Sequence, residues 1–292
     1  MNLSLHDAIS IVATAPARCG FLSGSPLSIL MHRRDLIKAG LVTGAAATTG
    51  FRAPVIPPDS RRHYELRNYE LRSDVNPTGL RNFHKDALLP AYARAGAGAV
   101  GVFSPETGFP SQSLLVLIEY PSLAAVQTVA DRLDADAAFM AAQRTFETAA
   151  DLPYLRYDSQ LMRAFTGHSG VEVPPGPATR PARVFELRTY EARSATALAR
   201  KVAMFNEAEI VLFRSIDMTP VFFGENLFGT RLPSLTYMLT FEDMTARYKA
   251  WSAFGAHPEW QRLNKDEKYA ANGAVTVTNV AYLRPLAFSP IR

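Results

Sequence analysis

The sequence predicts an α+β fold: two tandem ferredoxin-like βαββαβ units packed sheet to sheet as a pseudo-dimeric α/β barrel. A short phrase occurs twice, as Tyr-Glu-Leu-Arg-Asn-Tyr-Glu at 64–70 and Phe-Glu-Leu-Arg-Thr-Tyr-Glu at 185–191, a separation of 185 − 64 = 121 residues. Matching residues continue at this separation as far as Leu-Met-Arg at 161–163 and Tyr-Leu-Arg at 282–284. A constant register of this length indicates an internal duplication.

The first half carries the signals of four strands and two helices. Alternation with a period of two, or a short apolar run, marks each strand. Asn-Pro at 76–77 is a typical helix start, and Gly96 a typical helix end. Pro90 should kink this helix or end it early. We predict strands at 63–71, 100–103, 114–120 and 154–165, and helices over 77–95 and 123–150, the second one broken near 134–136.

The second half repeats the same order of elements, with a helix capped by Ser194. We predict strands at 184–191, 220–224, 235–241 and 274–283, with a late helix over 244–270. Four antiparallel strands with two helices on one face leave the other face bare. Two such units can cover their bare faces by packing against each other.

Two segments lie outside the repeated units. A stretch rich in Pro and Gly separates them, so we expect a first domain at 61–168, a linker at 169–182 and a second domain at 183–292. Residues 1–60 are expected to form a leader. Arg33 and Arg34, followed by a short run rich in Gly and Ala, resemble a twin-arginine export signal. This predicts a bacterial protein that is periplasmic or secreted, with its biological start at Met31 rather than Met1.

Composition excludes several classes of function. The chain is 48% hydrophobic and 20% charged, as in an ordinary soluble globular protein, and its formal charge of +4 is small for 292 residues. We therefore expect no nucleic-acid partner. The single cysteine, Cys19, lies in the leader, so a mature chain would have no disulfide. We also expect no membrane span after signal removal.

At the two Glu-Leu-Arg-x-Tyr phrases the chain resembles the NIPSNAP family. His-Pro-Glu-Trp at 257–260 resembles the Asp-Pro-x-Trp stretch of that family, and Asp-Ala-Ala-Phe at 136–139 is a looser counterpart in the first half. The resemblance implies the dimeric α/β-barrel fold in tandem. Such barrels include cofactor-free monooxygenases, haem-binding enzymes and proteins without a known reaction, so the fold alone does not give the function.

The repeated phrase also supplies the candidate ligand site. We assign Leu66 and Leu187 to the core beneath the helices, which would turn the alternate residues toward the barrel interior. The predicted lining of that interior is Glu65, Arg67, Tyr69, Glu186, Arg188 and Tyr190, with Arg163 and Arg284 adding positive charge nearby. Each Glu-Arg pair is either a structural clasp between the sheets or part of a polar lining that binds an acidic or carbonyl-bearing ligand.

The histidines give no reason to expect a metal or another cofactor. No cluster of His, Cys, Asp and Glu has the spacing of metal ligands. We interpret His84 as a solvated helix residue and His257 as the cap of a helix break. Trp251 and Phe254, three residues apart, should pack together in the core.

Three functions remain open, and the sequence does not decide whether the protein is an enzyme. The first is a barrel that holds a small organic molecule between its sheets, with oxygenase-like chemistry and no metal if a reaction occurs. The second is a non-catalytic protein that acts through structural or partner contacts. The third, ranked last, is a haem-binding enzyme. The expected assembly is an intramolecular pseudo-dimer, and further homo-oligomerisation is left open.

Overall fold

The computed structural model describes residues 61–109, 112–176, 181–269 and 274–292. These residues belong to one compact unit. The predicted leader, with Met31, Arg33 and Arg34, lies outside the described residues. Where it is described, the linker between the two halves contains no helix or extended strand.

Eight antiparallel strands close into a barrel in the order β1-β3-β2-β8-β5-β7-β6-β4. Each half supplies one four-stranded sheet, and the β2–β8 and β4–β6 pairs join the two sheets at their edges. The strands are β1 (His63–Leu71), β2 (Val100–Thr107), β3 (Ser113–Tyr120), β4 (Tyr154–Ala164), β5 (Val184–Ala192), β6 (Thr219–Phe228), β7 (Ser234–Phe241) and β8 (Val275–Pro285). The predicted pseudo-dimeric α/β barrel is therefore confirmed.

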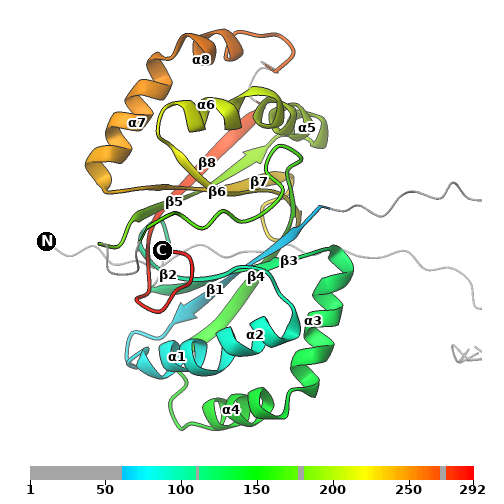
Figure 1. Cartoon of the computed structure of the whole chain (residues 1–292), viewed down its shortest axis with the longest axis vertical. Helices are drawn as coiled ribbons and strands as arrows, with labels where there is room; N and C mark the ends of the chain where they lie inside the picture. Colours follow the sequence, from blue (N-terminus) through cyan, green and yellow to red (C-terminus); the bar gives the residue numbers. More distant parts are fainter. Residues whose placement is uncertain (1–60, 110–111, 177–180, 270–273) are drawn as a thin grey trace, which may run out of the picture. The chain divides into compact units, whose positions relative to one another are not determined.

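The helices lie outside the barrel, with those of the first half on one side and those of the second half on the opposite side (Figure 1). The first half contains α1 (Thr78–Phe83), the π-helical turn η2 (His84–Leu88), α2 (Leu89–Ala95), α3 (Leu123–Ala135) and α4 (Ala137–Glu147). The second half contains α5 (Ala195–Met204), the π-helical turn η3 (Phe205–Glu209), α6 (Ile210–Ser215), α7 (Met244–Ala256) and α8 (Pro258–Leu263).

The 121-residue offset holds in the backbone. His63 pairs with Tyr120 in the first sheet, and Val184 pairs with Phe241 in the second. The two π-helical turns also lie at the same offset. Position 211 is valine where the first half has Pro90, so the π turn belongs to the repeated unit and is not caused by the proline. Pro90 lies at the start of α2 directly after η2, and the helix continues past it to Ala95, so the proline does not end the helix early.

The predicted helix breaks are confirmed. The side chain of Asp136 caps α4 by accepting a hydrogen bond from the backbone N–H of Phe139 (3.0 Å). Nδ1 of His257 caps α8 in the same way, by accepting from the backbone N–H of Glu259 (3.1 Å). Both residues separate the two late helices of their half, as the offset predicts.

Strands β2 and β6 are longer than the sequence predicts. Their additional residues pair across the seams, with Ser104 opposite Arg284 and Asn226 opposite Met162. In a single isolated unit these residues would lie on an unpaired sheet edge. Closure of the barrel therefore extends both strands.

The barrel interior contains an apolar core to which every strand contributes. Its largest members are aromatic or long aliphatic side chains, and Phe103 and Phe185 meet across the interior with ring centroids 5.1 Å apart. Two further hydrophobic clusters lie outside the barrel, one between each sheet and the helices of the same half. The interior cluster contains Tyr64, Leu66, Phe103, Leu115, Leu117, Met162, Phe185, Leu187, Val221, Phe222, Met238, Ala281 and Leu283.

This arrangement corrects the predicted orientation of the repeated phrase. Leu66 and Leu187 pack in the barrel interior, not beneath the helices. The residues predicted to line the interior therefore point outward, toward the helices: Glu65, Arg67, Tyr69, Glu186, Arg188 and Tyr190. The physical reason is desolvation: the apolar cluster around Leu66 and Leu187 excludes water from that part of the barrel, whereas the layer between sheet and helices opens at its rim and can hold paired charges at lower cost.

Candidate functional site

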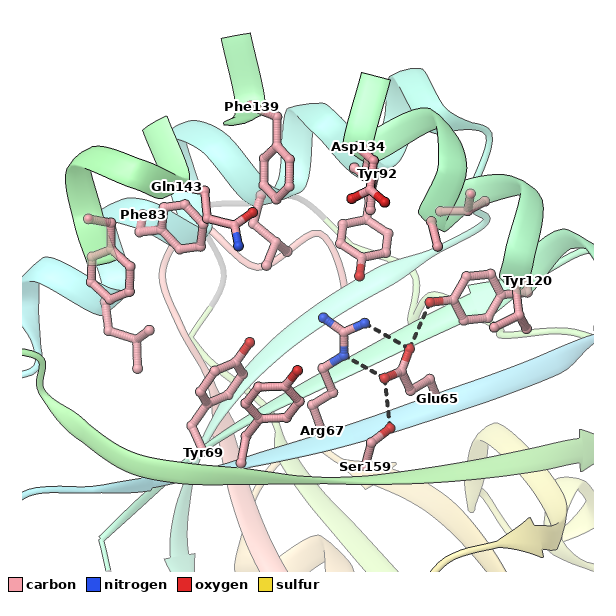
Figure 2. A pocket seen from close by; sticks show the side chains of 18 of the residues that line it. Glu65, Arg67, Tyr69, Phe83, Tyr92, Tyr120, Asp134, Phe139, Gln143 and Ser159 are labelled. Carbon is pink, nitrogen blue, oxygen red and sulfur yellow. Dashed lines mark hydrogen bonds and ion pairs between the residues drawn. The ribbon is translucent and has the colours of Figure 1, made fainter. Parts of the chain in front are cut away.

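A cavity of about 550 Å³ lies between the outer face of the first sheet and helices α1 to α4. Figure 2 shows Glu65, Arg67 and Tyr69 rising from β1 toward Phe83, Phe139 and Gln143 on the helices. The remaining wall is largely aromatic or aliphatic and includes Leu80, Leu88, Tyr92, Tyr120, Val129, Leu133, Phe146, Tyr154 and Tyr157. The cavity therefore combines an apolar wall with one polar group on its floor.

Glu65 is the centre of that polar group. Its Oε1 accepts hydrogen bonds from Nε of Arg67 (2.5 Å) and from the hydroxyl of Ser159 (2.7 Å). Its Oε2 accepts from Nη2 of Arg67 (3.1 Å) and from the hydroxyl of Tyr120 (2.7 Å). Burial favours the neutral acid, but these donors and the positive charge of Arg67 outweigh it and hold the pKa of Glu65 below its usual value. Glu65 is thus a saturated carboxylate that positions Arg67.

Arg67 lies between aromatic rings. Its guanidinium carbon is 5.7 Å from the ring centroid of Tyr92 and 5.8 Å from that of Tyr157. In Figure 2 the guanidinium nitrogen that does not contact Glu65 faces the cavity. Burial raises the pKa of Tyr69 to about 12 and also raises the pKa of Tyr92, so both phenols stay protonated at neutral pH. The floor therefore offers hydrogen-bond donors to a ligand oxygen.

His84 is fully buried, which contradicts its interpretation as a solvated residue. It lies in η2, where Nδ1 is 2.7 Å from the carbonyl oxygen of Leu80, so Nδ1 carries the proton and donates. Its ring contacts Tyr69 edge to face, with centroids 5.1 Å apart. Burial is the main cause that lowers the pKa of His84 to about 4. The imidazole is therefore neutral and packs against Tyr69 from the helix side of the cavity.

The second half builds a different polar cluster around Glu186, whose side chain is 0% exposed. Nη1 of Arg188 donates to its Oε1 (2.6 Å), and Nε of Arg247 donates to its Oε2 (2.9 Å). The indole N–H of Trp251 also donates to Oε2 (2.8 Å). Nε of Arg188 donates to the hydroxyl of Tyr190 (3.2 Å). Two arginines and a tryptophan thus hold one carboxylate.

A second cavity, of about 640 Å³, lies between the second sheet and its helices. Twelve of its lining positions lie 121 residues after positions that line the first cavity, so the two cavities are duplicates of one another. The equivalent pairs include Arg67 and Arg188, Tyr69 and Tyr190, Leu80 and Lys201, Phe139 and Trp260, and Tyr157 and Thr278.

Arg163 and Arg284 belong to neither cavity. They lie at equivalent places on the two seams, where Nη2 of Arg163 donates to Glu225 (2.6 Å) and Nε of Arg284 donates to Glu106 (3.0 Å). Each pair connects a strand of one half with a strand of the other. The structure therefore separates these two arginines from the six residues of the repeated phrase.

The space between the two sheets is small. Its cavity, of about 270 Å³, is lined by Asn68, Thr189, Asp158, Asn279 and their neighbours. Within the described residues, no group of three or more His, Cys, Asp and Glu side chains could hold a metal ion. The described helices include none with the length and apolar character needed to cross a membrane.

Each half of the chain separately matches the model of one known protein family. The NIPSNAP family model matches residues 64–166 and again residues 185–290. The chain belongs to the NIPSNAP family. It carries two NIPSNAP domains in tandem, as the resemblance of the repeated phrases indicates. No protein of curated function matches it.

Two solved structures resemble the tandem barrel over most of its length, and a third matches a single domain. A candidate monooxygenase from Fusobacterium nucleatum is 8% identical, with a TM-score of 0.52 over 78% of this chain and 93% of that chain. A candidate monooxygenase from Lactobacillus acidophilus is 10% identical, with a TM-score of 0.51 over 77% and 94%. A NIPSNAP-like domain protein from Burkholderia xenovorans is 22% identical over 37% of this chain and 89% of that chain, with a TM-score of 0.33. At these identities the first two share the fold with the NIPSNAP chain, and nothing is carried over about function.

Several residues of the two sites escaped the sequence analysis. Tyr120 and Ser159 reach Glu65 from neighbouring strands, and sequence spacing gives no sign of such contacts. Lys201 could have been found: it lies three residues after Leu198 and four before Phe205, on the helix face predicted to be buried. A charged residue on that face indicates that the polar groups lie beneath the helices.

Proposed function

We propose that the protein binds a small, partly apolar organic molecule in the first cavity, between the first sheet and helices α1 to α4. The cavity volume of about 550 Å³ falls within the usual range for small-molecule sites. The observation that carries the proposal is the combination of this aromatic cavity with the prearranged Glu65–Arg67 pair on its floor.

The floor favours an aromatic ligand that carries a hydroxyl or carbonyl oxygen. Arg67 and the protonated phenols of Tyr69 and Tyr92 are donors, while Glu65 is already saturated with hydrogen bonds. Asp134 and Glu147 also line the cavity and oppose an anionic ligand. A neutral phenol or quinone satisfies both conditions.

Oxygenase-like chemistry without a metal is the reaction that this binding mode would assist. A positive guanidinium and two phenol donors would stabilise negative charge on the oxygen of a bound phenol. A bound phenol whose proton has passed to water can react with O₂ as the oxidant. One oxygen atom joins the ring to give the quinone, and the other leaves as water with the displaced ring hydrogen and the returned proton. Binding comes first in this proposal, and the reaction is its second part.

Replacing Ala130 by tryptophan is expected to weaken ligand binding at least tenfold. Ala130 lines the first cavity from α3 and is exposed, so the change should not disturb the core. The second half already carries Trp251 at the equivalent position. Calorimetric titration of wild type and variant with 2-naphthol measures the effect, and an oxygen electrode follows O₂ uptake in the same samples.

The matched control is Ala124→Trp, which places the same side chain on an exposed position of α3 away from the cavity. It should bind as the wild type does. Native mass spectrometry of the protein purified from its own host would identify a ligand that copurifies with it. Equal affinity of Ala130→Trp and wild type would contradict the proposed site.

We further propose that the protein works after export by the twin-arginine route, on the basis of Arg33 and Arg34 in the leader. Replacing both by lysine is expected to retain the protein in the cytoplasm at its full precursor length. Cell fractionation measures this, and N-terminal sequencing of exported wild type should begin between residues 48 and 60. An exported double variant would contradict the assignment.

A further inference from the structure

We propose that the second cavity is a separate site, which binds an aromatic carboxylate rather than a neutral phenol. It is the duplicate of the first cavity in position, but its charged groups differ. The inference concerns Arg188, Lys201 and the aromatic residues around them, so it stands independently of any ligand in the first half.

Two cations of this cavity flank one aromatic ring. The guanidinium carbon of Arg188 is 5.5 Å from the ring centroid of Tyr190, and Nζ of Lys201 is 5.8 Å from the same centroid. Arg188 also stacks on Trp251 at 4.4 Å. A planar ligand in this space would therefore meet two positive groups and two aromatic faces.

The charge balance of the cluster favours an anion. Arg188, Arg247 and Lys201 are the cations, and Glu186 and Glu209 are the carboxylates. One positive charge remains without a counter-charge within the cluster. In the first half the Glu65–Arg67 pair is neutral, and acidic side chains line the remainder of the cavity. An anionic ligand would therefore neutralise a surplus positive charge in the second cavity, whereas the first cavity has no such surplus.

The aromatic residues of the second cavity already enclose a cation. Nζ of Lys201 lies 4.6 Å from the ring centroid of Phe205 and 5.5 Å from that of Trp260, and it donates to Glu209 (2.6 Å). Rings arranged in this way would otherwise suit a quaternary ammonium ligand. The ammonium group of Lys201 already occupies the space between these rings, so a cationic ligand cannot bind there. An anionic ligand could instead pair with Lys201.

Donors also remain for a carboxylate. Arg188 uses Nη1 on Glu186 and Nε on Tyr190, and within the described residues Nη2 makes no further hydrogen bond. Lys201 directs one N–H to Glu209 and a weak one to the sulfur of Met204 (3.6 Å), which leaves one of its three donors. A carboxylate that bridges Arg188 and Lys201 would occupy these donors.

The duplication shows which changes separate the two sites. Lys201 and Glu209 replace Leu80 and Leu88 of the first half at the same offset, and both pairs line their cavities. Each half thus has either a buried ion pair or two leucines at equivalent positions. This supplies a substitution that the fold has already accepted in its other half.

The test is the double substitution Lys201→Leu/Glu209→Leu in the full chain. Removing both partners leaves neither Lys201 nor Glu209 behind as an unpaired buried charge, and replacing a buried ion pair by apolar residues is often neutral for stability. We expect the wild type to bind 2-naphthoate and the variant to bind it at least tenfold more weakly, with its melting temperature retained. Calorimetry at pH 7.5 gives both affinities.

Two further variants assign the binding to this cavity. Arg188→Met should weaken 2-naphthoate binding by a similar factor, because Glu186 keeps Arg247 and Trp251 as partners and the fold is preserved. Ala130→Trp, in the first cavity, should leave it unchanged. The inference is overturned if the wild type does not bind 2-naphthoate, if the double variant binds it as tightly as wild type does, or if Ala130→Trp abolishes binding.

Discussion

Replacing Glu186 by leucine is expected to lower the free energy of unfolding by about 3–5 kcal/mol, the usual cost of removing one partner from a buried ion pair. Glu186 is inaccessible to solvent, and Arg188 and Arg247 both depend on it for their counter-charge. The indole N–H of Trp251 would lose its acceptor as well. Equilibrium denaturation in urea measures the loss.

Two controls separate this effect from the loss of any glutamate on β5. Glu191→Leu makes the same change on the same strand, but Glu191 pairs with a half-exposed Arg231 at 3.4 Å and accepts one hydrogen bond from Asn279 (2.8 Å), so the loss should be about 1 kcal/mol. Arg247→Met leaves Glu186 with Arg188 and Trp251 and should cost less than Glu186→Leu. A Glu186→Leu variant as stable as Glu191→Leu would show that the Glu186 cluster, which joins β5 to α7, does not stabilise the fold.

The error over strand orientation has a physical source. Alternation along 64–70 and 185–191 shows that the two faces of each strand differ, but it does not show which face meets the helices. The usual rule assigns leucine to the helix-covered face, because the other face of a half-covered sheet is solvated. In a closed barrel both faces are covered, and the face that is sealed from water is the more apolar one.

Other features could be predicted because they are local or because they repeat. The 121-residue offset predicts that the strand registers of the two halves agree, and the caps at Ser194 and His257 and the helix break near Asp136 follow from residue type and spacing. The seam pairs between β2 and β8 and between β4 and β6 could not be predicted, because they join segments whose alternation carries no sign of a partner. The extensions of β2 and β6 depend on those pairs.

The two cavities also show a limit of the duplication argument. Their positions follow from the repeat, since equivalent residues line both. The charges of the lining residues do not follow from it. Where the first cavity has Leu80, Ala130 and Asp134, the second has Lys201, Trp251 and Gly255 at the equivalent positions. The repeat therefore predicts where each cavity lies. Which ligand a cavity binds depends on the lining residues that differ between the two halves.

Between pH 6.5 and pH 4 the free energy of unfolding of the wild type should fall by about 3 kcal/mol because of His84, and replacing His84 by phenylalanine is expected to abolish this part of the fall. The folded protein keeps His84 neutral because burial lowers its pKa to about 4, against about 6.5 in an unfolded chain. As the pH falls below 6.5, the unfolded state takes up a proton that the folded state does not, so stability declines until about pH 4. Above pH 6.5 His84 contributes no pH dependence. The free energy of unfolding, measured by urea denaturation at intervals from pH 4 to pH 8, gives the two profiles.

The second half supplies the reason to choose phenylalanine. Phe205 occupies the equivalent position in η3 and is fully buried there, so the π-helical turn accepts that ring. Some acid sensitivity should persist in the variant, because burial also lowers the pKa of His168. The difference between wild type and variant isolates His84, since the other titrating groups are common to both. Parallel profiles between pH 4 and pH 6.5 would mean that His84 takes up its proton in the folded state, and that water or a ligand group reaches its Nε2 in the layer between β1 and the helices.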